Sequence, residues 1–246
     1  MDLLSGIGRA AGDIGSRLLD LALPATCAGC EREGAGLCRD CLPALDGRLL
    51  CPPGTPIGLP GDVPSPLVQV EWCASFNGVT RRALHRLKYA GDRRLAVPLG
   101  RAVGRRWARA GVGGQVLVPV PASPDRVRDR GYDQAALIAQ AASAVCGLPV
   151  RPLLERSRAT TAQFDLDREA RTGNVANAFR LRHPRSEIGP PGARPAPGDA
   201  RPMLDGVWVV LVDDVLTTGS TLAACARVLL DDGALAVSAV TVARER

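Results

Sequence analysis

Residues 209–221 read VVLVDDVLTTGST, and this stretch decides the fold. It opens with four apolar residues, a run of the kind that is buried in a parallel sheet. Two aspartates follow, and a turn rich in hydroxyl groups then leads into a helical pattern that ends at Gly233. The order of strand, turn and helix predicts an α/β fold. In such folds ligands bind at the carboxyl ends of the strands, so we expect a ligand at this turn.

The turn after the predicted strand combines two kinds of chemistry. It consists of Thr217, Thr218, Gly219, Ser220 and Thr221. A helix N-terminus presents free N–H groups, so this turn is a candidate anion site, and Gly219 would let a phosphate approach the backbone. The carboxylates of Asp213 and Asp214 fit hydroxyl groups nearby. A phosphate beside a diol describes ribose 5-phosphate; the alternative is a helix whose Ser and Thr residues only cap its first turn.

Apolar runs and helical patterns alternate through the rest of the second half and through the middle of the chain. They predict strands at residues 70–76, 115–120, 207–212 and 237–243, and helices at residues 78–89, 95–109, 133–146 and 220–232. The short connections favour right-handed parallel crossovers. We therefore expect residues 69–246 to form one α/β domain, a mostly parallel sheet flanked by helices.

Three segments depart from this alternation. Residues 1–23 have the apolar period of an amphipathic helix, which we expect to pack on the protein itself. Residues 51–68 are dense in proline and glycine, which predicts a linker or an irregular continuation of the cysteine-containing segment before it. Residues 183–206 include a polar stretch with six prolines and three glycines, so we expect a flexible insertion within the second domain.

Four of the eight cysteines have the spacing of a metal site. Cys27 and Cys30 form one Cys-x-x-Cys pair, and Cys38 and Cys41 form a second. Four thiolates on two tight turns complete the tetrahedral shell of a structural Zn²⁺. Unligated or redox-active cysteines are the alternative, and disulfides fit a reducing compartment poorly. The pattern predicts a Cys₄ zinc ribbon over residues 24–50, whereas Cys51 has no partner at this spacing.

Composition and charge exclude several classes of protein. Aromatic residues make up 3% of the chain, which leaves little material for a base-stacking platform. Apolar runs are far shorter than the roughly 18 residues that span a bilayer, and the N-terminus lacks the uninterrupted apolar region of a secretory signal. We therefore expect a cytoplasmic protein without membrane insertion. Residues 81–109 hold ten basic residues against one acid, either a stripe that binds nucleic-acid phosphates or two solvated helix faces.

Several motifs in this order resemble the ComF family of competence proteins. They are LKYAGD at residues 87–92, VPVP at 118–121, RGYDQ at 130–134, RSRATTAQ at 156–163 and NVANAF at 174–179. Residues 209–221 in turn resemble the signature with which type I phosphoribosyltransferases bind 5-phosphoribosyl-1-pyrophosphate (PRPP). The resemblance runs from Cys27 to Arg244. It departs from the family pattern at Asp133, where the family usually has Asn, and at Cys51, which lacks the mate of a second cysteine knuckle.

The resemblance implies a role for each motif. Asp213 and Asp214 would hold the ribose hydroxyls of PRPP, residues 217–221 its 5′-phosphate, and Mg²⁺ would bridge substrate oxygens. Residues 121–130 would form a pyrophosphate loop. Its candidate contacts are Ala122, Ser123, Arg126 and Arg130, with Lys88 as a weaker candidate. Residues 156–171 resemble a mobile flap, in which Arg156, Arg158, Gln163 and Arg168 would lie near the leaving group.

Two functions from different classes follow from these assignments. The first is an enzyme that transfers ribose 5-phosphate from PRPP to an acceptor and releases pyrophosphate. The second is a non-catalytic module that binds PRPP or a nucleotide and acts in DNA uptake, through single-stranded DNA or through proteins of the uptake machinery. The motifs identify neither the acceptor nor the oligomeric state.

Overall fold

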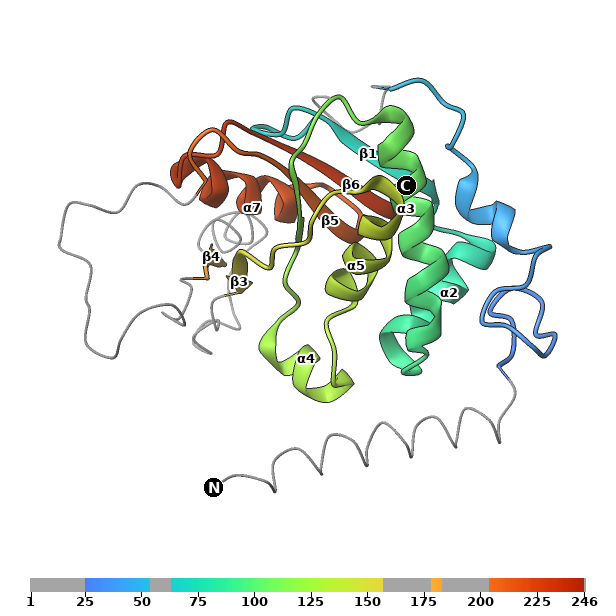
Figure 1. Ribbon diagram of the computed structural model, residues 1–246. Coiled ribbons are helices and arrows are strands. Elements are labelled where there is room, and N and C mark those ends of the chain that lie inside the picture. Colours follow the sequence, from blue (N-terminus) through green and yellow to red (C-terminus); the bar gives the residue numbers. More distant parts are fainter. Residues whose placement is uncertain (1–24, 54–62, 157–177, 183–203, 246) are drawn as a thin grey trace, which may run out of the picture.

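The computed structural model of the chain describes residues 25–53, 63–156, 178–182 and 204–245 (Figure 1). Its strands are β1 (Val70–Ser75), β2 (Val116–Pro119), β3 (Leu154–Arg156), β4 (Phe179–Leu181), β5 (Trp208–Leu216) and β6 (Ala236–Arg244). Its helices are α2 (Gly78–Tyr89), α3 (Ala96–Ala110), α4 (Pro124–Arg130), α5 (Gln134–Cys146) and α7 (Ser220–Asp231), with 3₁₀ turns η1 (Leu42–Asp46) and η2 (Arg93–Leu95). The predicted N-terminal helix, the centre of the predicted linker, most of the predicted flap and most of the predicted insertion lie outside the described residues.

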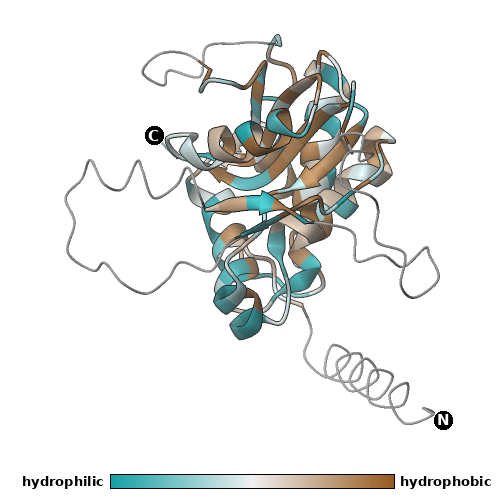
Figure 2. Ribbon diagram, turned by 90° about the vertical axis from the view of Figure 1, so that its left-hand side faces the viewer, coloured by the Kyte–Doolittle hydropathy of each residue, from teal (hydrophilic) through white to brown (hydrophobic). Residues whose placement is uncertain are grey.

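Four strands form a parallel sheet in the order β1-β6-β5-β2. Alternate residues of β5 face opposite sides, as the geometry of a strand requires. Val209 and Leu211 pack with α7, whereas Val210 and Val212 pack with α2, α3 and α5. The strands are accordingly mostly hydrophobic between the two helical layers (Figure 2). The predicted α/β fold with a mostly parallel sheet is confirmed.

The structure differs from the sequence prediction at the carboxyl edge of this sheet. Strand β5 continues through both aspartates to Leu216, because its backbone pairing with β6 continues to the register of Leu216 with Arg244. The predicted loop at residues 121–130 contains the helix α4. Two residues favour this helix: Pro124 stands at its first position, and Gly131, with φ of 77°, follows its last residue.

The cysteine-containing segment packs directly on the helical layer beside it. Cys27, Leu37 and Leu45 are buried in the same hydrophobic cluster as Leu84 of α2 and Leu99 of α3. In Figure 1 the segment runs alongside α2 and α3. The segment and the sheet domain therefore share one core. None of the described helices is long and apolar enough to cross a membrane.

A buried arginine fastens the end of this segment to the sheet. Arg106 of α3 is 1% exposed, and its guanidinium donates to the Glu71 carboxylate of β1 at 2.5 Å. It also donates to the backbone carbonyls of Arg48 and Cys51, each at 2.7 Å. A buried charge is tolerated only with such partners. Arg106 therefore ties α3, β1 and the chain after η1 together.

Candidate functional site

The segments that follow β2 and β5 meet at one edge of the sheet. The two strands are parallel neighbours, with Pro119 in register with Val212. One residue further on, the Val120 N–H donates to the Val212 carbonyl at 2.9 Å. This pairing places the predicted pyrophosphate segment beside the two aspartates. Helices α5 and α7 both begin at this edge.

The first turn of α7 is open toward solvent. Its N-cap residue is Gly219, in the left-handed region with φ of 77°, which has no side chain to cap the helix. A Cβ at Gly219 would also lie 2.4 Å from Cγ of Pro64. The Oγ atoms of Thr218 and Ser220 lie 3.0 Å apart and are exposed, with the Ser220 N–H 3.4 Å from the Thr218 hydroxyl. Local capping therefore accounts for the hydroxyl group of Thr218, which accepts the Ser220 N–H, but not for the other hydroxyl groups of this turn.

The two aspartates have different environments because neighbouring residues of a strand point to opposite faces. Asp214 is buried, and its Oδ2 lies 2.9 Å from Nζ of Lys88. Asp213 is partly exposed, and its Oδ1 accepts the Asp214 backbone N–H at 2.8 Å. Desolvation, and then the negative charge of Asp214, raise the pKa of Asp213 well above its ordinary value. The two carboxylates therefore do not form an equivalent pair.

Lys88 lies on α2, where its ammonium group pairs with Asp214 and not with the 121–130 segment. A second contact to Asp214 comes from Gln134, which donates through Nε2 at 3.1 Å. The Oε1 atom of Gln134 accepts from Nη1 of Arg130 at 2.8 Å. Gln134 was not among the predicted site residues, although it ends the RGYDQ motif. These contacts join three sequence motifs at one place.

The predicted pyrophosphate segment is held by Asp133. The Oδ2 atom of Asp133 accepts the Ala122 N–H at 2.9 Å, and its Oδ1 accepts the N–H groups of Ala135 and Ala136 at 2.9 and 3.2 Å. In this conformation the Ala122 N–H is therefore bonded to Asp133, and its contact with pyrophosphate stays a prediction. Ser123 is the N-cap residue of α4.

The remaining predicted contacts are divided between described and undescribed residues. Arg126 is exposed on α4. Arg156 is exposed at the end of β3, with its guanidinium carbon 5.3 Å from the ring centre of Phe179. Burial raises the pKa of the Cys225 thiol in α7, and the charges of Asp213 and Arg156 both act on it. Leu154 and Phe179 pack in the same buried cluster as Leu211 and Cys225, so the end of β3 lies on the α7 side of the sheet, the side that Asp213 faces. Arg158, Gln163 and Arg168 lie outside the described residues.

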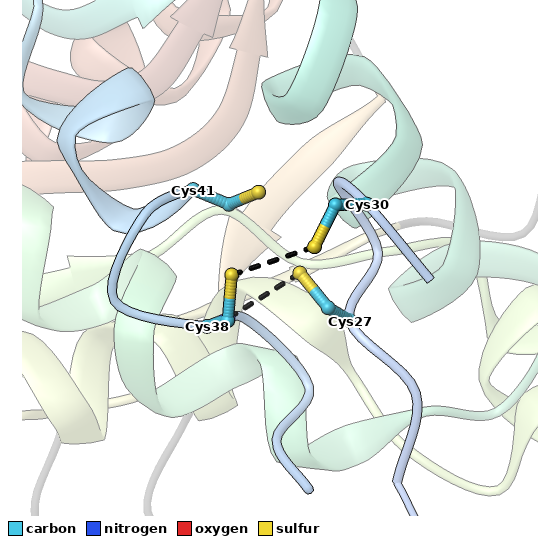
Figure 3. A group of neighbouring side chains, drawn as sticks. All are labelled: Cys27, Cys30, Cys38 and Cys41. Atoms are coloured by element: carbon cyan, nitrogen blue, oxygen red, sulfur yellow. Dashed lines mark hydrogen bonds between the residues drawn. The ribbon is translucent and has the colours of Figure 1, made fainter. Parts of the chain in front are cut away.

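The four predicted cysteine ligands converge in the segment that precedes β1 (Figure 3). Their Sγ atoms lie within 4.8 Å of one another. A tetrahedral Zn²⁺ with bonds of about 2.3 Å would hold four sulfurs about 3.8 Å apart. Cys27 Sγ also accepts the N–H groups of Gly29 and Cys38, each at 3.3 Å. The cluster therefore has the size and donor set of a Cys₄ metal site.

The electrostatics of the cluster also fit a cation. Although burial raises the pKa of Cys27, backbone N–H groups of Cys38, Cys30 and Gly29 lower it to about 6. Burial, and then hydrogen bonds from the other thiols, raise the pKa of Cys41 to about 12. Four thiolates at this spacing repel one another unless a cation lies among them. At Gly29 a Cβ would lie 2.4 Å from Cys41 Sγ, so this turn admits only glycine.

Comparisons with known proteins agree with this geometry. A family model for the phosphoribosyl transferase domain matches residues 162–246. The chain is 30% identical over 236 residues to the DNA utilization protein YhgH of Salmonella typhimurium, covering 88% of this chain and 96% of that protein. It is 35% identical over 109 residues to Competence protein F of Haemophilus influenzae, with coverages of 44% and 41%. It is 25% identical over 174 residues to Competence protein ComFC of Bacillus subtilis, with coverages of 69% and 62%.

The parallel sheet and the segment after β5 define a phosphoribosyltransferase-like protein. The YhgH relative, which matches 88% of this chain, and the two competence proteins identify the family within this class. The chain belongs to the ComF family.

Proposed function

We propose that this protein binds PRPP with Mg²⁺ at the carboxyl edge of the sheet and transfers its ribose 5-phosphate to an acceptor, releasing pyrophosphate. The observation that carries the proposal is the open start of α7, where exposed hydroxyl groups surround a glycine N-cap beside the partly exposed Asp213. The match of the phosphoribosyl transferase model to residues 162–246 supports it.

In this proposal the phosphate and the ribose are held by different groups. The amides and hydroxyls of residues 217–221 bind the 5′-phosphate, because a helix N-terminus favours an anion. Asp213 accepts hydrogen bonds from the ribose hydroxyls. Asp214, fixed by Lys88 and Gln134, holds the strand end and adds negative charge behind the sugar. The carboxylate oxygens suit a hard cation such as Mg²⁺, which would neutralise charge on the departing pyrophosphate.

The reaction requires little acid–base catalysis from the protein. A dissociating pyrophosphate needs positive charge and hydrogen-bond donors at fixed positions. Arg130 is held by Gln134 close to Asp214 and is the best-placed described cation after Lys88, with Ser123 and Arg126 further along the same segment. Following the family resemblance, Arg156, Arg158, Gln163 and Arg168 would approach the leaving group when the flap closes and excludes water.

Two measurements test this proposal. Calorimetry with PRPP and Mg²⁺ should show binding to the folded protein. Labelled pyrophosphate should exchange into PRPP in the presence of the correct acceptor product, screened across purine and pyrimidine ribonucleotides. Binding without exchange would leave a PRPP-binding module, whereas folded protein without any PRPP binding would refute the proposal.

We also propose that Cys27, Cys30, Cys38 and Cys41 hold one structural Zn²⁺. A closed shell of four thiolates leaves no position for a substrate, so the ion would support folding only. Purified protein should contain about one zinc per chain. Cys38→Ser should lose it, and Cys51→Ser, outside the cluster, should retain it. Metal-free, folded wild-type protein would contradict the assignment.

A second candidate function is contact with a nucleic acid, for which the surface between the cysteine segment and α3 is the best location. A pocket there is lined by Arg39, Arg94, Arg101 and Arg105 and by one acid, Asp46, which pairs with Arg105 at 2.8 Å. Arg106, by contrast, is buried. The ten basic residues predicted as a possible stripe therefore do not form one surface. The names of the DNA utilization and competence relatives favour a DNA partner.

Charge reversal would test this surface. Arg39→Glu with Arg101→Glu should weaken binding to a single-stranded oligonucleotide and reduce the salt dependence of that binding. PRPP affinity should stay unchanged, because neither residue contacts the edge of the sheet. Unaltered oligonucleotide affinity in the double variant would rule this surface out.

A further inference from the structure

Tyr89, at the end of α2, differs from the other aromatic residues that the structure describes. It is 67% exposed, whereas Trp72, Trp107, Tyr132 and Phe179 are buried. Phe76 and Trp208 are partly buried. A single exposed aromatic side chain is ordinary on a protein surface. Its position decides whether it has a role.

The ring of Tyr89 lies at the rim of the proposed PRPP site. The residue before it is Lys88, whose Nζ lies 2.9 Å from the Asp214 carboxylate. From the other side, the guanidinium carbon of Arg130 lies 5.3 Å from the centre of the Tyr89 ring. Arg130 reaches the same Asp214 through Gln134. The ring therefore follows Lys88 directly in the chain and contacts Arg130, and both of these residues lead to Asp214.

The ring is also held in place by its own helix. His85, one turn earlier on α2, has its ring centre 4.7 Å from that of Tyr89, with the planes tilted by 47°. The end of α2 is anchored because the Tyr132 hydroxyl donates to the carbonyl of Leu87. Arg86 pairs with Asp92 at 2.8 Å just beyond it. Tyr89 therefore presents an oriented and exposed aromatic surface.

We propose that Tyr89 stacks a nucleobase beside the ribose of PRPP. The inference rests on the proposed function, which requires an acceptor next to the sugar, and it assigns that acceptor to the planar heteroaromatic class. An aromatic ring binds any base through its π-face, and the Arg130 cation adds attraction to an electron-rich ring. The same chemistry accepts a free base or a base within a single strand of DNA.

Fluorescence of 2-aminopurine tests the proposal, because stacking quenches it. Two probes separate the sources of the base: free 2-aminopurine, and an oligothymidine with one 2-aminopurine. Each is titrated with the full-length protein, with and without PRPP and Mg²⁺. The variants are Tyr89→Ala and Tyr89→Phe. Leu235→Ala is the control, since Leu235 is equally exposed but precedes β6 at the opposite edge of the sheet.

Tyr89→Ala should weaken binding of the quenched probe by about tenfold or more, and Tyr89→Phe and Leu235→Ala should bind as the wild type does. Quenching of the free base only with PRPP identifies an acceptor site, and quenching of the strand without PRPP identifies a strand site. Calorimetry should show unchanged PRPP affinity in all three variants. The proposal is overturned if the wild type quenches neither probe, or if Tyr89→Ala binds both normally. If the wild type does not bind PRPP, the proposed function is refuted instead. The quenching would still show whether Tyr89 stacks on a base.

Discussion

Helices α5 and α7 begin at the same edge of the sheet but have opposite first turns. At α5 the carboxylate of Asp133 accepts two backbone N–H groups of the helix and a third from Ala122. At α7 the N-cap residue is Gly219, and hydroxyl groups lie around the exposed turn. A capping side chain typically stabilises a helix by about 1 kcal/mol. Of these two helices, only α7 has no capping side chain at its N-cap residue, whereas α5 is closed by the protein's own carboxylate.

The largest effect should come from closing the α7 turn as α5 is closed. Thr218→Asp places a carboxylate beside the first amides of α7, where the phosphate would bind. Repulsion between the two anions should lower PRPP affinity at least about 100-fold. The variant should fold with unchanged or slightly higher stability, because an acid favours a helix N-terminus. Calorimetry and thermal unfolding measure both effects.

Thr218→Val is the matched control for this variant. It removes one hydroxyl without adding charge, so it should lose about tenfold in affinity. If Thr218→Asp binds PRPP as tightly as the wild type, the phosphate does not bind at α7, and the contrast between the two helices has no functional meaning.

An intermediate effect should come from opening α5. Asp133→Ala removes its cap and the acceptor for Ala122, which should cost about 1–2 kcal/mol. The melting temperature should fall by roughly 2–8 °C for a chain of this size. Asp133→Asn should retain the cap through Oδ1 but release the Ala122 N–H and remove one negative charge. Pyrophosphate affinity should then rise a few-fold; an unchanged affinity would show that Ala122 is not a ligand.

The smallest effect on stability should come from Asp213, whose pKa is raised by burial and by Asp214. Because the pKa of Asp213 is higher in the folded protein than in the unfolded chain, ionising this carboxyl group destabilises the fold. The free energy of unfolding should therefore fall as pH rises through the folded pKa. Asp213→Asn should therefore unfold a few degrees higher than the wild type at pH 7. The difference should vanish below about pH 4, where the unfolded carboxyl is protonated too.

Ligand binding should show the opposite dependence on pH. If the Asp213 carboxylate accepts the ribose hydroxyls, the affinity of the wild type for PRPP and Mg²⁺ should rise with pH as this group ionises. Asp213→Asn should bind weakly and without that rise. Calorimetry between pH 5 and pH 8 separates the two proteins, and parallel profiles would remove Asp213 from the site.

Much of the fold could be predicted because its elements are strongly patterned. The bounds of α2 were predicted without error, and those of α5 and α7 to within one residue. The end of β5 was not, because Asp213 and Asp214 read as a turn, while backbone pairing with β6 holds them in the strand. Helix α4 was taken for a loop, since its seven residues include five charged side chains and no apolar face.

The sequence motifs identified residues that meet at this edge of the sheet, but not the contacts between them. The motifs identified Asp213, Asp214 and Lys88, but no local pattern relates α2 to β5, so the pairing of Lys88 with Asp214 required the topology. The same holds for Asp133, whose N-cap role follows from its place before α5 but whose bond to Ala122 does not. The role proposed for Tyr89 could not be predicted, because it depends on the exposure of this side chain, and no pattern in the sequence gives that exposure.

The shared core of the cysteine segment and the sheet has a consequence for how this architecture can change. Without residues before β1, Leu84 and Leu99 would lose their apolar cover, and Arg106 would keep Glu71 but lose its carbonyl partners. The cysteine segment and the sheet domain are therefore not independent folding units that could be exchanged separately between proteins. If the four cysteines hold the proposed Zn²⁺, removing the ion should therefore destabilise the sheet domain together with the cysteine segment, because both belong to one core.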